Sequence, residues 1–195
     1  MELLLAGYRR LFILFSNTGV TAPVFSEKTL ATEGGRMDVV ARGAMYAIWD
    51  TERPREDTAF IAVLNGPPNP PLTLVFRPTR ISLSEVSIGA EILRALRGES
   101  KLINIVRLDI LSLLGIVKRL GFLLVLLIEG GEDIASFSMP LDGKITFILG
   151  DHIGFPVSLL KSLEGVVDAR LSLGRVSYLG SHCIAFVNEI LDALS

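Results

Sequence analysis

The stretch of residues 145–150 constrains the fold of this chain most strongly. Its side chains do not alternate between apolar and polar, so the strand that it predicts must be covered on both faces. Strands of this kind are typical of the centre of a parallel sheet. Gly150 ends the strand, and ligands of open α/β sheets bind beyond the carboxyl ends of such strands. The stretch therefore predicts a binding site at this turn, although a glycine turn without a ligand explains the same residues.

Segments typical of strands alternate with segments typical of helices along the chain. Further strands are predicted over residues 10–16, 58–64, 72–76, 122–128, 134–138 and 166–173. Helices are predicted over residues 36–49, 83–96, 101–120 and 156–163, and a last one begins at the cap Ser181. A turn is predicted at Gly130 and Gly131. This alternation predicts an α/β fold with a mostly parallel sheet and helices on both faces.

The length of 195 residues predicts a single domain over residues 1–195, with residues 1–8 as an N-terminal extension. Half of the residues are hydrophobic, which indicates either contact with a membrane or apolar surface buried between subunits. The longest uninterrupted apolar run, residues 120–128, is far shorter than a bilayer span, so the subunit interface is favoured. The sequence order of residues 1–10 does not fit a signal peptide, and the single cysteine fits a reducing compartment. We therefore expect a cytoplasmic protein without a membrane segment.

The predicted helix that contains Asp38 follows two glycines, Gly34 and Gly35. Asp38 and Arg42 are four residues apart, so they lie on one face of the helix and can form an ion pair. An ordinary surface salt bridge of about 0.3–0.5 kcal/mol explains this spacing as well. Arginine supplies 14 of the 19 basic residues, and the guanidinium group is suited to binding phosphate. The net charge of −2, however, indicates no overall excess of positive charge for binding nucleic acid.

His182 and Cys183 are adjacent in the sequence, which raises the question of a cysteine nucleophile or a metal site. Adjacent residues of a helix point about a third of a turn apart, so His182 is badly placed to take the proton of Cys183. The chain has no CxxC or HxxxH pair to bind zinc and no GxGxxG pattern to bind a dinucleotide. We expect no metal, and Cys183 is more often a small buried residue than a nucleophile.

Five segments in a fixed order carry a resemblance to a known family: residues 35–42, 57–58, 66–71, 149–154 and 181–184. With them the chain resembles the archaeal tRNA pseudouridine N1-methyltransferases of the SPOUT superfamily, from about Arg10 to the last helix. The resemblance implies a SPOUT-type α/β fold with a C-terminal trefoil knot over about residues 145–195. It also implies a homodimer, S-adenosylmethionine as the methyl donor, and tRNA as the partner, methylated at pseudouridine 54 of the T-loop.

The resemblance also assigns residues to the binding of the cofactor. Carried over position by position, the pocket consists of Phe137, Gly150, Leu173, Gly174, Arg175, Val176, Ser177, Tyr178 and Cys183. Main-chain groups within an apolar shell would suit an amphipathic ligand.

The methylated nitrogen of pseudouridine carries a proton that must be lost. We expect Asp38 to act as base or orienter, and Arg36 and Arg42 to contact the tRNA, because these residues share a helix beside the double glycine. Arg55 and Asp57 are second candidates for binding the substrate. Two other functions stay open from the sequence: methylation of a pseudouridine in ribosomal RNA, and a non-catalytic RNA-binding module.

Overall fold

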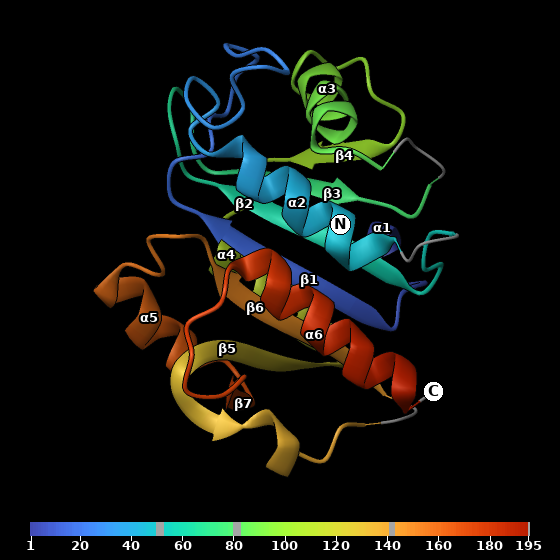
Figure 1. The fold of residues 1–195 in the computed structure, drawn as a ribbon, viewed down its shortest axis with the longest axis vertical. Coiled ribbons are helices and arrows are strands. Elements are labelled where there is room, and N and C mark those ends of the chain that lie inside the picture. The colour runs from blue at the N-terminus through green and yellow to red at the C-terminus, as the bar shows by residue number, and fades with distance from the viewer. Residues whose placement is uncertain (50–52, 80–82, 141–142, 195) are drawn as a thin grey trace.

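The protein was analysed as a computed structural model that describes residues 1–49, 53–79, 83–140 and 143–194. Seven strands form one sheet in the order β4-β3-β2-β1-β6-β5-β7 (Figure 1). Five of these strands are parallel: β1 (Arg10–Ser16), β2 (Thr58–Leu64), β5 (Phe122–Asp133), β6 (Lys144–Gly150) and β7 (Ala169–Ser172). Two antiparallel pairings add β3 (Leu72–Phe76) and β4 (Ile103–Val106) at one edge. The predicted α/β class and mostly parallel sheet are confirmed.

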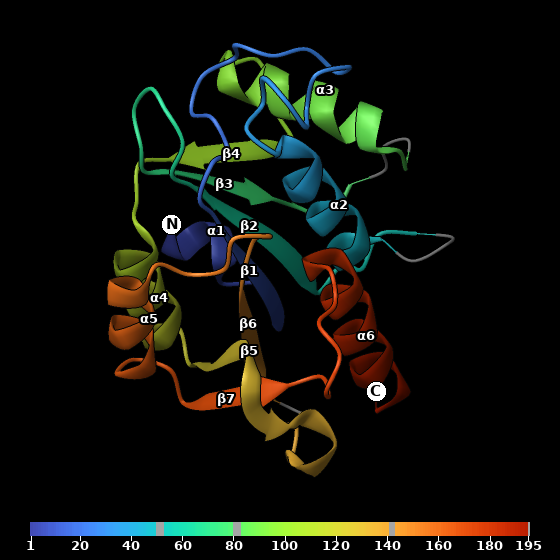
Figure 2. The ribbon, with the colours of Figure 1, turned by 60° about the vertical axis from the view of Figure 1, so that its left-hand side comes forward.

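Helices cover both faces of the sheet, which is seen almost edge-on in Figure 2. One face is covered by α2 (Met37–Ile48), α3 (Glu85–Leu96) and α6 (Gly180–Ala193). The other face is covered by α1 (Glu2–Leu5), α4 (Ile110–Arg119) and α5 (Val157–Glu164). Leu5 is fully buried in the second layer, so the N-terminal residues are part of the packed structure.

The strand β6 has the central position that its sequence predicts. It pairs in parallel with β1 on one side and β5 on the other. Phe147 and Leu149 face the core beneath α2 and α6, and Ile148 faces the core on the opposite side. Burial on both faces explains why the strand has no polar alternation.

The prediction of a turn at Gly130 and Gly131 is wrong, because both glycines lie inside β5. The register between β5 and β7 shifts between Leu127 and Glu132, so the strand contains an irregularity there. Gly130 has a φ of +76°, and a Cβ at Gly131 would lie 2.7 Å from the main chain of Leu171. Glycine at these positions thus lets the strand kink and continue instead of reversing.

Three other predicted elements differ from the structure. Residues 134–138 form no strand but a short 3₁₀ helix, Ile134–Ser136, whose first turn is capped by the Asp133 carboxylate. The single helix predicted over residues 101–120 is β4 followed by α4, with Asp109 capping the start of α4. Ser181 does not cap α6 but is buried within its first turn.

Candidate active site

A groove of about 690 Å³ opens at the carboxyl ends of β5, β6 and β7. Leu127, Leu149 and Leu171 line it from these strands, and the loop of residues 173–179 lines it before α6 begins. Its volume falls in the range of about 300–1,000 Å³ that is usual for small-molecule sites. The groove is at the turn where the sequence predicts a binding site.

The turn after β6 is held to the end of β1 by a buried carboxylate. Asp151 accepts hydrogen bonds from the main-chain and side-chain nitrogens of Asn17, at 2.6 and 2.8 Å, and from the main chain of Ile153 at 3.0 Å. A Cβ at Gly150 would lie 2.9 Å from the Cα of Gly154, so this tight turn requires glycine. These contacts fix the backbone that forms one wall of the groove.

An arginine–carboxylate cluster at the start of α2 borders the same groove. Asp38 accepts hydrogen bonds from Nε and Nη2 of Arg36, at 2.9 and 3.1 Å, and from Nη2 of Arg42 at 2.7 Å. Nη1 of Arg42 donates to Glu85 on α3 at 2.8 Å. Arg36 has a φ of 66°, a conformation that residues other than glycine rarely adopt, and this positions it beside Asp38. The predicted ion pair between Asp38 and Arg42 is confirmed.

The side chain of Asp38 is only 6% exposed, and its charge state follows from its neighbours. Burial raises the pKa of Asp38, but the hydrogen bonds from Arg36 and Arg42 outweigh that effect, so its pKa lies below the ordinary value. The carboxylate is therefore ionised at neutral pH and holds protons weakly. It is well suited to orient the two guanidinium groups, and poorly suited to accept a proton.

The loop before α6 forms the opposite side of the groove. The Ser177 hydroxyl donates a hydrogen bond of 2.6 Å to the Glu129 carboxylate, which joins this loop to β5. Sγ of Cys183 lies 3.9 Å from the carbonyl oxygen of Tyr178. Burial raises the pKa of the Cys183 thiol, which disfavours the thiolate that a nucleophile needs.

Most of the residues that the sequence analysis assigns to the site lie together on this groove. Those that line it are Arg36, Arg42, Gly150, Leu173, Gly174, Val176, Ser177, Tyr178 and Cys183. Asp38 does not line the groove itself, but it accepts hydrogen bonds from both arginines that do. Phe137 packs half-buried against the core, and Arg175 is exposed on the loop; neither lines the groove.

Arg55 and Asp57 are not brought to the groove. Both precede β2, so they lie at the amino ends of the parallel strands, whereas the groove is at the carboxyl ends. Arg55 donates a hydrogen bond of 2.8 Å to Asp192 near the end of α6, and Asp57 accepts one from Thr58.

Four titratable residues line the groove that the sequence analysis does not assign to it: Glu129, Asp151, His152 and His182. Asp151 and His152 come directly after the buried strand, and that position is itself the signal of a site residue in an α/β sheet. Glu129 has no such signal, because its position depends on the continuation of β5 past Ile128.

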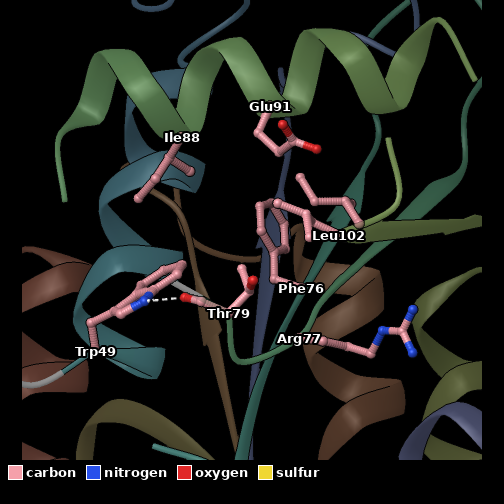
Figure 3. Close-up of a pocket in the computed structure, with 8 residues that line it drawn as sticks. Trp49, Phe76, Arg77, Thr79, Ile88, Glu91 and Leu102 are labelled. Atoms are coloured by element: carbon pink, nitrogen blue, oxygen red, sulfur yellow. Dashed lines mark hydrogen bonds between the residues drawn. The ribbon is translucent and has the colours of Figure 1, made fainter. Parts of the chain in front are cut away.

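A second cavity, between α3 and the sheet, is much smaller at about 10 Å³. Trp49, Phe76 and Glu91 line it, and the Trp49 indole donates a hydrogen bond of 2.7 Å to the carbonyl of Thr79 (Figure 3). This space is at the lower limit for one water molecule, so the groove is the candidate for ligand binding.

Among the described residues, no group of three or more His, Cys, Asp or Glu side chains could hold a metal ion. In the same part of the chain, no helix is long and apolar enough to cross a membrane.

The fold and the groove define an α/β protein with a groove of small-molecule size at the carboxyl ends of its parallel strands. Over residues 9–195 the chain matches the model of a family described as SAM-dependent RNA methyltransferases. A tRNA (pseudouridine(54)-N(1))-methyltransferase of Thermococcus kodakarensis is 34% identical over 200 residues, which cover 95% of this chain and 100% of that protein. The enzyme of the same name from Methanocella arvoryzae is 34% identical, covering 94% and 98%. The chain therefore belongs to the tRNA (pseudouridine(54)-N(1))-methyltransferase family, and the resemblance is confirmed.

A solved structure agrees with this assignment at the level of the fold. The chain is similar to Archaeoglobus fulgidus Nep1 bound to S-adenosylhomocysteine, with a TM-score of 0.67 and coverage of 96% of this chain and 98% of that one. The sequence identity is 17%, so this likeness concerns the fold alone.

Proposed function

We propose that this protein transfers a methyl group from S-adenosylmethionine to N1 of pseudouridine 54 in the T-loop of tRNA. The observation that carries the proposal is one groove that joins the glycine turn after β6 to the cluster of Arg36, Arg42 and Asp38. The first part suits a cofactor, and the second suits an anionic nucleic acid. Curated relatives with this activity in their names match the chain over nearly its full length.

The groove fits S-adenosylmethionine in size and chemistry. Its lining combines leucine side chains with residues 172–174 and 176–183, whose main chain carries amide and carbonyl groups suited to an adenine edge. When bound, this cofactor supplies a methyl group on a positively charged sulfur. Gly150, Tyr178 and Cys183 are proposed to hold the cofactor, together with the loop that connects β7 to α6. The roles of Phe137 and Arg175 in binding the cofactor stay predictions, because neither residue lines the groove.

The arginines of α2 are proposed to receive the nucleotide. Their guanidinium groups can bind a phosphate or stabilise the negative charge that forms on the base when N1 loses its proton. Asp38 is proposed as a positioning residue, because its carboxylate fixes both groups and its pKa is held low. Holding N1 in line with the methyl group is the main contribution expected of the protein.

We further propose a homodimer and a trefoil knot over about residues 145–195. Exposed apolar side chains beside the groove, including Ile153, Val157 and Leu179, support an interface between subunits. Two features support a threaded chain. The strand β6 lies between β1 and β5, and α6 returns from the edge strand β7 to pack on α2. A cytoplasmic location fits a tRNA substrate.

The proposal is tested in two steps. Calorimetry with S-adenosylhomocysteine is expected to show binding at one site per chain, and no heat would indicate a non-catalytic RNA-binding module. Methylation is then measured on a tRNA transcript with pseudouridine at position 54, on the same transcript with uridine, and on a ribosomal RNA hairpin. Product on the first RNA alone supports the proposal, whereas product on the hairpin alone would move the substrate to ribosomal RNA.

A further inference from the structure

One histidine of the groove is placed beside a buried carboxylate. His152 directly follows Asp151 in the turn after β6, and both residues line the groove. Nδ1 of His152 lies 4.0 Å from Oδ1 of Asp151, and the His152 side chain is 36% exposed. The Asp151 carboxylate accepts hydrogen bonds from Asn17 and from the main chain of Ile153, so its position beside the imidazole is fixed.

Methylation at N1 of pseudouridine requires a group that accepts a proton, and most polar groups of the groove are unsuited to this. Asp38 is paired with two arginines and has a lowered pKa, and Glu129 accepts the hydrogen bond of Ser177. Burial raises the pKa of Cys183, so its thiol keeps its proton. Arg36 and Arg42 are cations and have no acceptor atom. Two imidazoles remain on the groove, His152 and His182.

The surroundings distinguish these two imidazoles. His182 is exposed on the first turn of α6, next to Cys183 and therefore beside the cofactor part of the groove. His152 belongs to the same turn as Asp151, whose negative charge interacts with Arg36 of the arginine cluster. The pKa of Arg36 is raised by its hydrogen bond with Asp38 and, in smaller measure, by the charges of Asp151 and Glu85. His152 thus lies in a turn that borders the cofactor part of the groove and that also interacts, through the charge of Asp151, with the arginine cluster where the nucleotide is proposed to bind.

We propose that His152 is the catalytic residue that accepts the N1 proton of pseudouridine, and that Asp151 is the positioning residue that holds its imidazole. The inference rests on the proposed function. A small rotation of the imidazole would bring Nδ1–H into hydrogen-bond distance of Asp151 and leave Nε2 free as the acceptor. Distances in unliganded sites are often long and shorten when the substrate binds.

The proposed step balances in atoms and charge. The N1–H bond breaks, and the proton goes to Nε2 of the neutral imidazole. The electron pair left on N1 forms the bond to the transferred methyl carbon. The pair of the sulfur–methyl bond returns to the sulfur, which becomes a neutral thioether, and the imidazolium gives its proton to solvent. Asp151 stabilises the imidazolium while it exists.

The experiment compares His152→Gln with wild type and with His182→Gln, the matched change at the other imidazole. Single-turnover methylation of a synthetic T-arm hairpin with pseudouridine is measured from pH 5 to 9. We expect the wild-type rate to rise with pH, as the proton acceptor loses its own proton, and then to level off. We expect His152→Gln to be slower by about 10²–10⁴-fold and to lose this rise. S-adenosylhomocysteine affinity by calorimetry is expected to stay within about twofold.

A second readout needs no cofactor. The imidazole signals of His152 are followed by NMR while the hairpin is added with pseudouridine, uridine or N1-methylpseudouridine at the target position. Only pseudouridine offers an N1–H donor, so we expect a shift of the Nε2 signal with that RNA and a much smaller one with the other two. Equal shifts with all three RNAs would overturn the inference.

Other outcomes separate this inference from the proposed function. If wild type methylates the hairpin and His152→Gln does so at the same rate, the proton acceptor is not His152. Loss of the pH-dependent rise in His182→Gln but not in His152→Gln assigns the role to His182 and overturns the proposal. If wild type itself neither binds S-adenosylhomocysteine nor methylates, the proposed function fails first. If His152→Gln melts at a lower temperature than wild type, the test is repeated with His152→Asn, which introduces a shorter side chain.

Discussion

Two arginine–carboxylate clusters lie at opposite ends of the sheet and use the same chemistry differently. At the carboxyl ends, Asp38 binds Arg36 and Arg42. At the amino ends, Arg10 on β1 donates hydrogen bonds to Asn188 and Asp192 of α6, at 2.7 and 2.8 Å.

The two clusters differ in what remains available to a ligand. Asn188 also donates to the carbonyl groups of Tyr46 and Ala47, so the amino-end cluster joins β1, α2 and α6. Its arginine is buried, since the side chain of Arg10 is only 8% exposed, although that of Asp192 is 41% exposed. In the carboxyl-end cluster the side chains of Arg36 and Arg42 are 37% and 29% exposed, and both line the groove. The polarity of the sheet thus decides which arginine–carboxylate cluster lies beside an opening.

The largest effect is expected from Arg10→Ala. It leaves Asn188 buried without the guanidinium, so we expect the free energy of unfolding to fall by about 3 kcal/mol. Urea unfolding measures the loss, and Arg97→Ala, at an exposed arginine, is the control, with a change below about 0.5 kcal/mol. The turnover of the folded variant is expected to match wild type; a decrease comparable to that of Asp38→Asn would remove the contrast.

Asp38→Asn is expected to act on activity instead. The amide removes the charge that orients Arg36 and Arg42, so kcat/KM for pseudouridine-containing tRNA is expected to fall about 10–100-fold. S-adenosylhomocysteine affinity, measured by calorimetry, is expected to stay unchanged. Unchanged turnover would remove Asp38 from the mechanism.

A smaller effect is expected from Asp192→Asn, with a defined pH dependence. Burial raises the pKa of Asp192, but the hydrogen bonds from Arg55 and Arg10 outweigh it, so the folded-state pKa is lowered. Its contribution is therefore full above the unfolded-state pKa of about 3.9 and is lost as the pH falls through the folded-state pKa. Because the side chain is 41% exposed, we expect only about 0.5–1 kcal/mol at pH 7. A difference from wild type that does not shrink as the pH is lowered below the unfolded-state pKa would contradict this assignment.

The smallest effect is expected from Glu85→Gln. Glu85 shares Arg42 with Asp38, but its side chain is 38% exposed, and Asp38 alone can orient the guanidinium. We expect a change below about 0.5 kcal/mol in unfolding and less than twofold in turnover. Thermal unfolding and the tRNA methylation assay measure both quantities, and a loss as large as that of Asp38→Asn would show that α3 positions Arg42.

The order of the elements was predictable because local patterns determine them. The mostly apolar character of residues 145–149, without alternation, identified the central strand, and the spacing of the helix that contains Asp38 identified the pair with Arg42. The prediction was wrong where a distant partner decides the local conformation. Gly130 and Gly131 are typical of a turn, but the pairing of Leu127 and Glu132, on either side of them, with β7 keeps this stretch in a strand.

The candidate site was predictable in part for the same reason. Gly150 and the loop before α6 were assigned to one pocket, and they do line one groove. Arg55 was assigned to the substrate, yet it lies at the amino ends of the strands, since a sequence does not state the direction in which each connection runs.

By itself the sequence determined the α/β class, the central strand, the family and the charge pair of α2, because each depends on residues that are close together in the chain or on motifs in a fixed order. The tertiary structure alone decided which of two similar arginine clusters opens onto the groove, and that Asp151 and His152 face it. The reason is physical: the end of a strand at which a side chain lies, and whether other elements cover it, depend on the pairing of segments that are more than a hundred residues apart, such as Asn17 with Asp151.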